Sequence, residues 1–214
     1  MTAPTDADLE RKFRRASFLL STPELYPLPE DKGCEVAFAG RSNAGKSSAL
    51  NAIVDQNALA RTSKTPGRTQ HLVVFALEPQ ERLVDLPGYG YAKVPLALKR
   101  AWHQLIDAYV TDRRSLTGIV VVSDIRHALT EFDLQMLHYC RARNLPCVVL
   151  LSKADKLNRG PALEVRNRVL REIAALGIEA EALVFSAHAK TGIAEARRAI
   201  ENLLVVPADI DDAP

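Results

Sequence analysis

Cysteine is scarce in this chain, with three residues among 214, at Cys34, Cys140 and Cys147. The number is odd, and no pair shows the Cys-x-x-Cys spacing of zinc and redox sites. A disulfide framework and a structural zinc site are therefore excluded, and the thiols are expected to be reduced, as in a cytosolic protein. Histidine is dispersed, which indicates no Cys/His or Ser/His/Asp catalytic set, and each one is interpreted as a surface or core residue: His71, His103, His127, His138 and His188.

The sequence also lacks long apolar runs. No stretch approaches the roughly 20 residues of a membrane-spanning helix, and no segment of signal-peptide type follows the basic residues near the N-terminus. The formal net charge of +2 is too small to indicate nucleic-acid binding by itself. Together these features predict a soluble, cytoplasmic protein with no membrane partner.

The length suits one sizeable α/β core with a short segment at each end. Residues 1–33 are punctuated by proline and are expected to form a basic arm packed on or flanking the main domain, residues 34–206. Residues 207–214 form an acidic tail. The basic cluster of the arm is interpreted as a solvated face, with contact to an anionic partner as the alternative, and comprises Arg11, Lys12, Arg14 and Arg15.

From residue 35 onward, apolar strand-like runs alternate with helical patterns, which predicts an α/β fold. The expected strands cover residues 35–39, 71–77, 82–85, 118–124, 146–152 and 182–186. The expected helices cover residues 46–55, 95–113, 130–143, 161–176 and 192–204. The short link between the second and third strands suits a hairpin. We therefore expect a six-stranded, mostly parallel sheet with one antiparallel edge strand and helices on both faces.

The most informative stretch follows the first expected strand and opens the first expected helix. It reads Gly40-Arg41-Ser42-Asn43-Ala44-Gly45-Lys46-Ser47, the pattern of a phosphate-binding loop. Its glycines allow backbone N–H groups to point at phosphate oxygens, and the helix N-terminus behind them favours negative charge. Lys46 is expected to reach the β- and γ-phosphates, and the Ser47 hydroxyl is expected to bind Mg²⁺.

A second motif, Asp85-Leu86-Pro87-Gly88, directly follows an expected strand. Open α/β sheets bind ligands at the carboxyl ends of their strands, so Asp85 is expected to reach Mg²⁺ through water. Gly88 has no side chain to block its N–H from a γ-phosphate. Between the two motifs lies the turn-rich segment 62–70, in which Thr69, rather than Thr65, is the expected additional Mg²⁺ ligand.

A third motif, Ser152-Lys153-Ala154-Asp155, ends the fifth expected strand and selects the base. Guanine presents N1–H and its exocyclic amine as adjacent donors, which one carboxylate accepts together, whereas adenine has an acceptor at N1. Asp155 is therefore expected to read guanine, and the stem of Lys153 to pack along the base. The backbone of Phe185-Ser186-Ala187, at the end of the sixth expected strand, would donate to guanine O6.

These motifs, in this order across residues 35–204, resemble those of a translation-factor-class small GTPase. Three segments are closer still to one family: residues 39–43, residues 62–70 and Asp85-Leu86-Pro87-Gly88-Tyr89-Gly90-Tyr91-Ala92 resemble the EngB (YsxC/YihA) family of bacterial GTPases, within the TrmE-Era-EngA-EngB-septin-like group. The resemblance implies a Ras-like P-loop GTPase domain, Mg²⁺ held by Ser47 and Thr69, and a role in assembly of the large (50S) ribosomal subunit. Ser152 departs from the pattern, because the family usually has threonine there.

The resemblance also gives the full expected nucleotide site. Besides the residues already named, that site includes Ser48, Gly67, Arg68, Gln70 and His71. The expected ligands are GTP and GDP, and the expected partners are the 50S subunit or its assembly intermediates, including ribosomal RNA and protein. The protein is expected to act as a monomer and to be needed for normal growth and division.

Catalysis is expected to be slow. Tyr89 follows Asp85-Leu86-Pro87-Gly88 where Ras-like enzymes carry the glutamine that orients the attacking water. One hypothesis supplies a remedy, since related GTPases with asparagine at the position of Asn43 use it to hold K⁺ beside the phosphates. The alternative is that Asn43 stabilises the loop through an Asx-type hydrogen bond. The expected catalytic residues are Lys46, Thr69 and Gly88, with Asn43 as the K⁺ ligand.

The motifs leave other functions open. A P-loop ATPase or nucleotide kinase would lack the base-reading Asp155, and a nucleotide-dependent binding module would show negligible turnover. A GTPase acting in tRNA modification or septation shares all the motifs. Basic residues beside the nucleotide loops would face RNA, with further positive charge along the next helix: Lys64, Arg68 and Lys93, then Lys99, Arg100, Arg113 and Arg114, beside Trp102.

Overall fold

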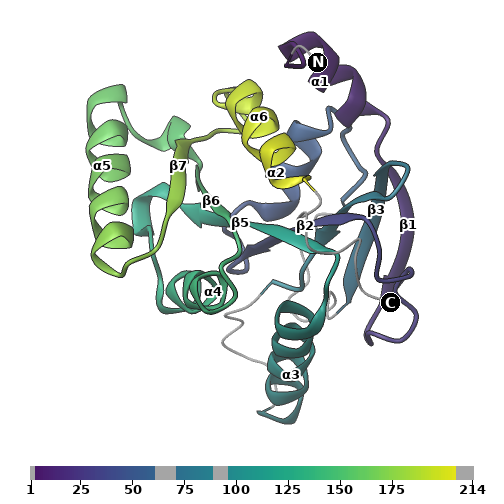
Figure 1. The fold of residues 1–214 in the computed structure, drawn as a ribbon. Coiled ribbons are helices and arrows are strands. Elements are labelled where there is room, and N and C mark those ends of the chain that lie inside the picture. Colours follow the sequence, from purple (N-terminus) through teal and green to yellow (C-terminus); the bar gives the residue numbers. More distant parts are fainter. Residues whose placement is uncertain (1–2, 61–70, 89–95, 206–214) are drawn as a thin grey trace.

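The computed structural model describes residues 3–60, 71–88 and 96–205, without the side chains of residues 96–99, 101 and 102. Seven strands form one sheet in the order β1-β3-β4-β2-β5-β6-β7 (Figure 1). The strands are β1 (Ser17–Thr22), β2 (Cys34–Gly40), β3 (Leu72–Glu78), β4 (Glu81–Asp85), β5 (Leu116–Asp124), β6 (Cys147–Ser152) and β7 (Ala180–Val184). The helices are α1 (Asp6–Arg14), α2 (Lys46–Ile53), α3 (Leu96–Asp112), α4 (Glu131–Ala142), α5 (Arg159–Ala175) and α6 (Ile193–Leu203).

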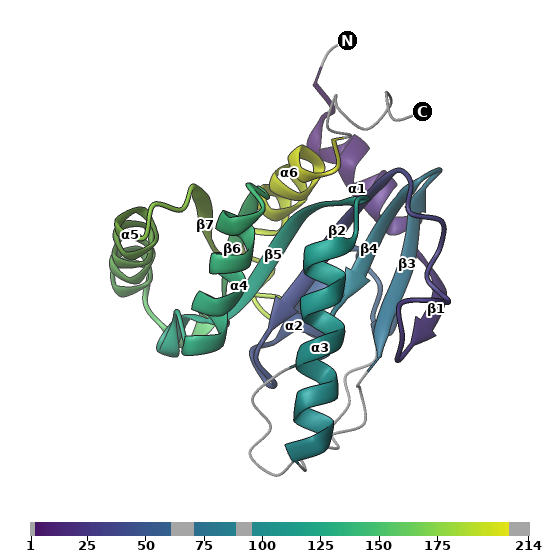
Figure 2. The same ribbon diagram turned by 60° about the horizontal axis from the view of Figure 1, so that its bottom comes forward.

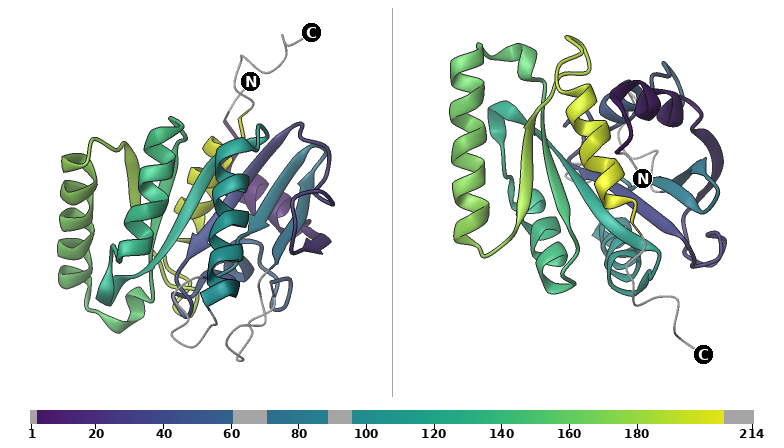
Figure 3. Two further views of the ribbon diagram at one scale, coloured as in Figure 1. Left: turned by 90° about the horizontal axis from the view of Figure 1, so that it is seen from below. Right: turned by 45° about the horizontal axis from the view of Figure 1, so that its top comes forward.

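Helices cover both faces of the sheet, as Figures 2 and 3 show from further sides. The central strands are buried on both faces, so their side chains alternate between two cores. Ala37 and Val121 belong to the core shared with α3, α4 and α5. Val36 and Val120 belong to the core shared with α1, α2 and α6. In the described part of the chain, no helix is both long enough and apolar enough to cross a lipid bilayer.

The predicted α/β fold with a mostly parallel sheet is confirmed, but the strand count and the edge differ. β3 pairs antiparallel with both β1 and β4, so the reversed strand lies one position inside the edge. The edge strand is β1, which comes from the segment expected to be an arm. Its side chains are mostly exposed, so it lacks the alternation by which a half-buried strand is recognised.

The same segment contains α1, a helix that was not predicted. Thr5 and Asp8 form a capping box at its start, and Leu9 and Phe13, one turn apart, are buried against the domain. The basic cluster is not uniformly solvated: Arg11 is exposed, but Lys12 forms ion pairs with Glu81 and Glu201 at 2.8 and 2.7 Å. These contacts fasten α1 to β4 and α6.

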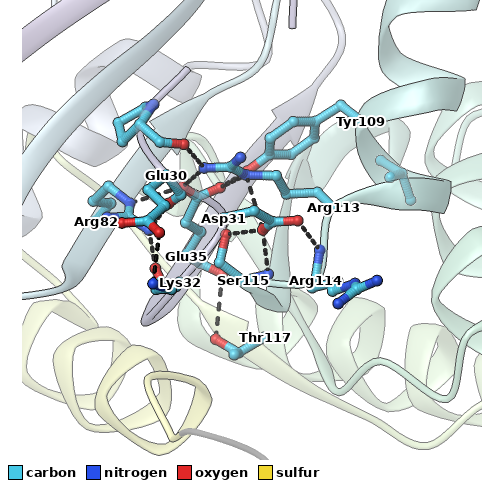
Figure 4. Close-up of polar contacts among 12 residues, drawn as sticks. Glu30, Asp31, Lys32, Glu35, Arg82, Tyr109, Arg113, Arg114, Ser115 and Thr117 are labelled. Atoms are coloured by element: carbon cyan, nitrogen blue, oxygen red, sulfur yellow. Dashed lines mark hydrogen bonds and ion pairs between the residues drawn. The ribbon is translucent and has the colours of Figure 1, made fainter. Parts of the chain in front are cut away.

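At the end of the sheet where β2 begins, a buried ionic cluster fastens the C-terminal end of α3 (Figure 4). Glu35 is fully buried and accepts hydrogen bonds from Arg82 of β4, Tyr109 of α3 and Arg113 just beyond α3. Arg113, expected to add to a basic outer surface, is therefore turned inward. The charged neighbours offset the cost of burying the carboxylate.

Candidate functional site

The phosphate-binding loop joins the end of β2 to the start of α2. A Cβ at Gly40 would lie 2.7 Å from the carbonyl oxygen of Val122, so only glycine fits there. Gly45 caps α2 with a φ of 94°, a left-handed conformation that glycine adopts without strain. The free N–H groups at the start of α2 face the loop, and a helix N-terminus attracts anions.

Lys46 and Asp85 meet behind this loop. β4 lies beside β2 in parallel register, with Asp85 opposite Phe38, so Asp85 ends its strand next to the loop. The Lys46 ammonium donates a hydrogen bond to the Asp85 carboxylate, and the two residues are only 8% and 5% exposed. A buried cation and anion beside a phosphate loop have the charges that complement a phosphate and a metal ion, respectively.

The chain after β4 crosses close to the phosphate loop. Leu86 donates its N–H to the Phe38 carbonyl at 3.0 Å, and both Leu86 and Pro87 are buried. A Cβ on Gly88 would lie 3.6 Å from the Cα of Ser42, so the Gly88 backbone runs directly beside the loop. The sequence motif around Asp85 is thus placed where its backbone can face a terminal phosphate.

The donors beside the phosphate loop are of the type that Mg²⁺ uses. Among the residues described, no three His, Cys, Asp or Glu side chains come together as a metal site. Mg²⁺ is usually bound through one or two carboxylates together with water and substrate phosphates. Asp85, together with the Ser47 hydroxyl at the start of α2, would offer that type of donor set.

Asp155 is held at the opposite end of the site. Ser186 donates its hydroxyl to the Asp155 carboxylate at 2.7 Å, and Ala154 donates its N–H to the Phe185 carbonyl at 3.0 Å. The hydrogen bond from Ser186, followed by that from Lys156, holds the pKa of Asp155 below its ordinary value. The carboxylate is thus ionised at neutral pH. Ser186, just after β7, fixes its orientation.

A cavity of about 240 Å³ opens beside Asp155. Its lining combines residues of the tetrapeptide predicted to read the base, of the segment around the start of α2 and of the segment after β7: Gly45, Ser48, Ser152, Lys153, Asp155, Lys156, Phe185, Ala187 and His188. Lys156 and His188 were not expected in the site. Only their nearness in sequence to Asp155 and Ala187 could have indicated them.

Two side chains tie the base end of the site to the phosphate loop. The Ser152 hydroxyl hydrogen-bonds the Ala44 carbonyl, and the Lys153 ammonium donates to the Asn43 carbonyl. Asn43 and Lys153 both adopt left-handed backbone conformations, with φ of 66° and 58°. Within the described residues, the Asn43 side chain itself forms no hydrogen bond, so the structure shows no Asx-type bond there.

Part of the expected site lies outside the described residues, namely Gly67, Arg68, Thr69 and Gln70, together with Tyr89. Three other predicted site residues lie in the described part of the chain, outside the contacts given above. His71 is half-buried, and its Nδ1 lies 3.1 Å from the Ser21 hydroxyl of β1. Arg41 and Ser48 are exposed. The remaining predicted residues lie in the phosphate loop, at Asp85–Gly88 or around the cavity.

Comparison with known proteins identifies what this arrangement is similar to. The family model described as "50S ribosome-binding GTPase" matches residues 35–153, more than half of the chain. A "Probable GTP-binding protein EngB" of Stenotrophomonas maltophilia (strain K279a) is 55% identical over 187 residues, which cover 87% of this chain and 94% of the relative. A protein of the same name from Xanthomonas axonopodis pv. citri (strain 306) is 50% identical over 201 residues, 94% of this chain and 92% of the relative.

Solved structures agree on the fold. A crystal structure of a probable GTP-binding protein engB matches with a TM-score of 0.65 and 20% identity, covering 80% of this chain and 98% of that one. A variant of Aquifex aeolicus Era bound to GDP.AlF4- matches with a TM-score of 0.59 and 20% identity, covering 85% of this chain and 61% of that one. At such low identity the two structures support the fold alone.

Proposed function

Because this chain belongs to the EngB family of GTP-binding proteins, P-loop GTPases, we propose that it hydrolyses GTP slowly and acts as a nucleotide switch in assembly of the 50S ribosomal subunit. The observation that carries the proposal is the joint position of Lys46 at the phosphate loop and Asp155 at the base cavity. The family model, described as a ribosome-binding GTPase, supports the choice of partner.

The assignment of guanine rests on the fixed Asp155 carboxylate. An acceptor facing the N1–H and exocyclic amine of guanine makes two charge-assisted hydrogen bonds, whereas it would oppose the N1 lone pair of adenine. A mismatch of this kind leaves a buried polar group unpaired and costs on the order of 1–3 kcal/mol. Ser186 keeps the Asp155 carboxylate in place, so the base can bind with little further loss of side-chain freedom in Asp155.

The assignment of phosphate chemistry rests on the other end of the site. Lys46 would bind the β- and γ-phosphates, and Ser47, Thr69 and water on Asp85 would hold Mg²⁺, which neutralises charge on the phosphates. Gly88 would donate its N–H to the γ-phosphate. With Tyr89 in place of a water-orienting glutamine, slow turnover is expected. A K⁺ ion held by Asn43 would supply further positive charge.

The proposal extends to the setting of the reaction. The protein would act as a cytoplasmic monomer on assembly intermediates of the large subunit, contacting ribosomal RNA and protein, and would be needed for normal growth and division. Nucleotide state would be transmitted through the segments beside the γ-phosphate, because these are the parts of such switches that change with the nucleotide.

Cosedimentation tests the proposed partner. The purified protein is centrifuged with isolated 50S and 30S subunits in the presence of a non-hydrolysable GTP analogue, GDP or an ATP analogue. We expect binding to 50S that is stronger with the GTP analogue than with GDP. Equal binding to both subunits in every nucleotide would reject the assembly role and direct attention to tRNA modification or septation.

Turnover is tested separately. GTP hydrolysis by the wild type is compared with that by Lys46→Ala, which removes the phosphate-binding ammonium but leaves the base cavity. A wild-type rate no higher than that of the variant would make the protein a guanine-nucleotide-dependent binding module. Equal competition by ATP and GTP would instead reject the guanine assignment.

A further inference from the structure

Asp124 ends β5 beside the base-reading tetrapeptide and has no role in the site described above. β5 and β6 run parallel, and their register places Asp124 opposite Ser152. Figure 1 shows the two strands side by side, between β2 and the edge strand β7. The Asp124 side chain is only 15% exposed. It therefore lies within reach of Lys153, the next residue after β6.

Arg126 holds the Asp124 carboxylate from one side. The Arg126 backbone N–H and Nε donate to Oδ1 at 3.1 and 3.0 Å, and Nη2 donates to Oδ2 at 2.7 Å. The backbone bond also caps the short 3₁₀ helix Ile125–His127 that follows β5. A carboxylate bound through both oxygens to a planar guanidinium has one fixed orientation. The orientation of Asp124 is thus set independently of Lys153.

Lys153 approaches the same carboxylate from the site. Its Nζ lies 3.0 Å from Asp124 Oδ2 and donates a hydrogen bond to the Asn43 carbonyl in the phosphate loop. Burial raises the pKa of Asp124, but the hydrogen bonds from Arg126 and Lys153 outweigh this effect and leave the pKa below its ordinary value. Asp124 is therefore charged at neutral pH and attracts the Lys153 ammonium.

Without the charge of Asp124, the Lys153 ammonium would keep only the neutral Asn43 carbonyl as an acceptor. A lysine side chain has several rotatable bonds, so holding it in one position costs conformational entropy. The Asn43 carbonyl alone is a weak anchor for so flexible a chain, whereas a fixed carboxylate and a fixed carbonyl together define one position. In that position Lys153 lines the base cavity and bridges to the phosphate loop.

We propose that Asp124, oriented by Arg126, is a positioning residue that fixes Lys153 between the base cavity and the phosphate loop and thereby slows the release of guanine nucleotide. The inference rests on the proposed guanine site. Its role differs from that of Asp155, because Asp124 touches Lys153 rather than the base. The conformation of Lys153 would then depend on Asp124, a residue outside the tetrapeptide 152–155.

The test is a double-mutant cycle read as the dissociation rate of a fluorescent GDP. Asp124→Asn removes the charge at nearly constant shape, and Lys153→Met removes the ammonium but keeps most of the stem. We expect Asp124→Asn to accelerate release about tenfold, the effect of losing one charge-assisted hydrogen bond. Because Asp124 acts through Lys153, the double variant should release GDP no faster than Lys153→Met alone.

Two further variants separate positioning from general damage. Asp124→Ser retains an acceptor that can cap residues 125–127 but lacks the charge, so it should also release GDP about tenfold faster. Asp112→Asn removes an exposed carboxylate at the far end of α3 and should leave the rate unchanged. The preference for GDP over IDP, which lacks the exocyclic amine, should be the same in Asp124→Asn and the wild type, because Asp155 reads that amine.

The outcomes distinguish the two hypotheses. A release rate for both Asp124 variants within about twofold of the wild type, or effects of Asp124→Asn and Lys153→Met that multiply in the double variant, would overturn the positioning role. A wild-type protein that binds ADP as tightly as GDP would instead overturn the proposed guanine site on which the inference depends.

Discussion

Replacing Glu35 by glutamine tests how the far end of the sheet is held together. The Glu35 carboxylate is fully buried and accepts hydrogen bonds from Arg82 Nε at 2.7 Å and Tyr109 OH at 2.9 Å. Arg113 donates to it twice, at 3.0 and 2.7 Å. Glu35→Gln preserves shape but replaces one acceptor oxygen by an NH₂ group, which faces these donors.

The magnitude follows from the charges that lose their partner. Breaking a buried ion pair by removing one member costs about 3–5 kcal/mol, because the other charge stays buried and uncompensated. Arg113 keeps a second carboxylate, Asp31, at 3.4 Å, so the low end of that range, about 3 kcal/mol, is expected. At about 2–4 °C per kcal/mol for a chain of this size, the melting temperature should fall by about 6–12 °C.

Thermal and urea unfolding measure the effect. Glu30→Gln is the matched control, because Glu30 pairs with Lys32 on the surface with a side chain that is 74% exposed. Exposed pairs contribute about 0–1 kcal/mol, so this variant should unfold close to the wild type. If Glu35→Gln destabilises the protein no more than Glu30→Gln, the buried cluster does not fasten α3.

Three further predictions concern the site and the same cluster. Asp155→Asn should weaken GDP binding at least about 100-fold and improve binding of xanthosine diphosphate, whose C2 oxygen accepts from the new amide; unchanged selectivity in a competition assay would contradict the base assignment. If Asn43 helps to hold K⁺, GTP turnover should be faster in KCl than in NaCl, and equal rates would reject that role. Burial, followed by the charge of Glu35, raises the pKa of Tyr109 well above its ordinary value. A folded-state pKa above the unfolded one gives stability that is complete below about pH 10 and is lost as the pH rises further. The difference in urea midpoint between the wild type and Tyr109→Phe should therefore be constant below about pH 10 and shrink above it, and a constant difference up to about pH 11.5 would refute this assignment.

The sequence predicts the centre of this fold better than its margin. The expected strand at 118–124 lies within β5, Leu116–Asp124, because a continuous apolar run is typical of a strand buried on both faces. The structure of the N-terminal segment cannot be predicted from apolar runs in this way. α1 is short, and β1 is exposed along most of its length, so their structure depends on contacts with distant residues such as Glu81 and Glu201.

The site shows the same division. Asp155 is predicted as the base-reading residue from a tetrapeptide because the donors of guanine require a carboxylate, a chemical argument that needs no coordinates. Asp124 could not be found in this way, since its link to Lys153 depends on which residues two parallel strands place side by side. His188 reaches the cavity only because the chain turns after β7, where Ser186 and Thr191 form an isolated bridge.

The contacts between Lys153 and Asn43, and between Ser152 and Ala44, join parts of the site that are about 110 residues apart in the chain. Both accepting groups are backbone carbonyls of the phosphate loop, so these contacts from Ser152 and Lys153 do not depend on the side chains of the loop. Such bonds restrict the loop before phosphate arrives and lower the ordering cost of binding. Base recognition and phosphate affinity should therefore be coupled. Replacing Lys153 should weaken the binding of GDP by more than the loss of its contact with the base alone would explain.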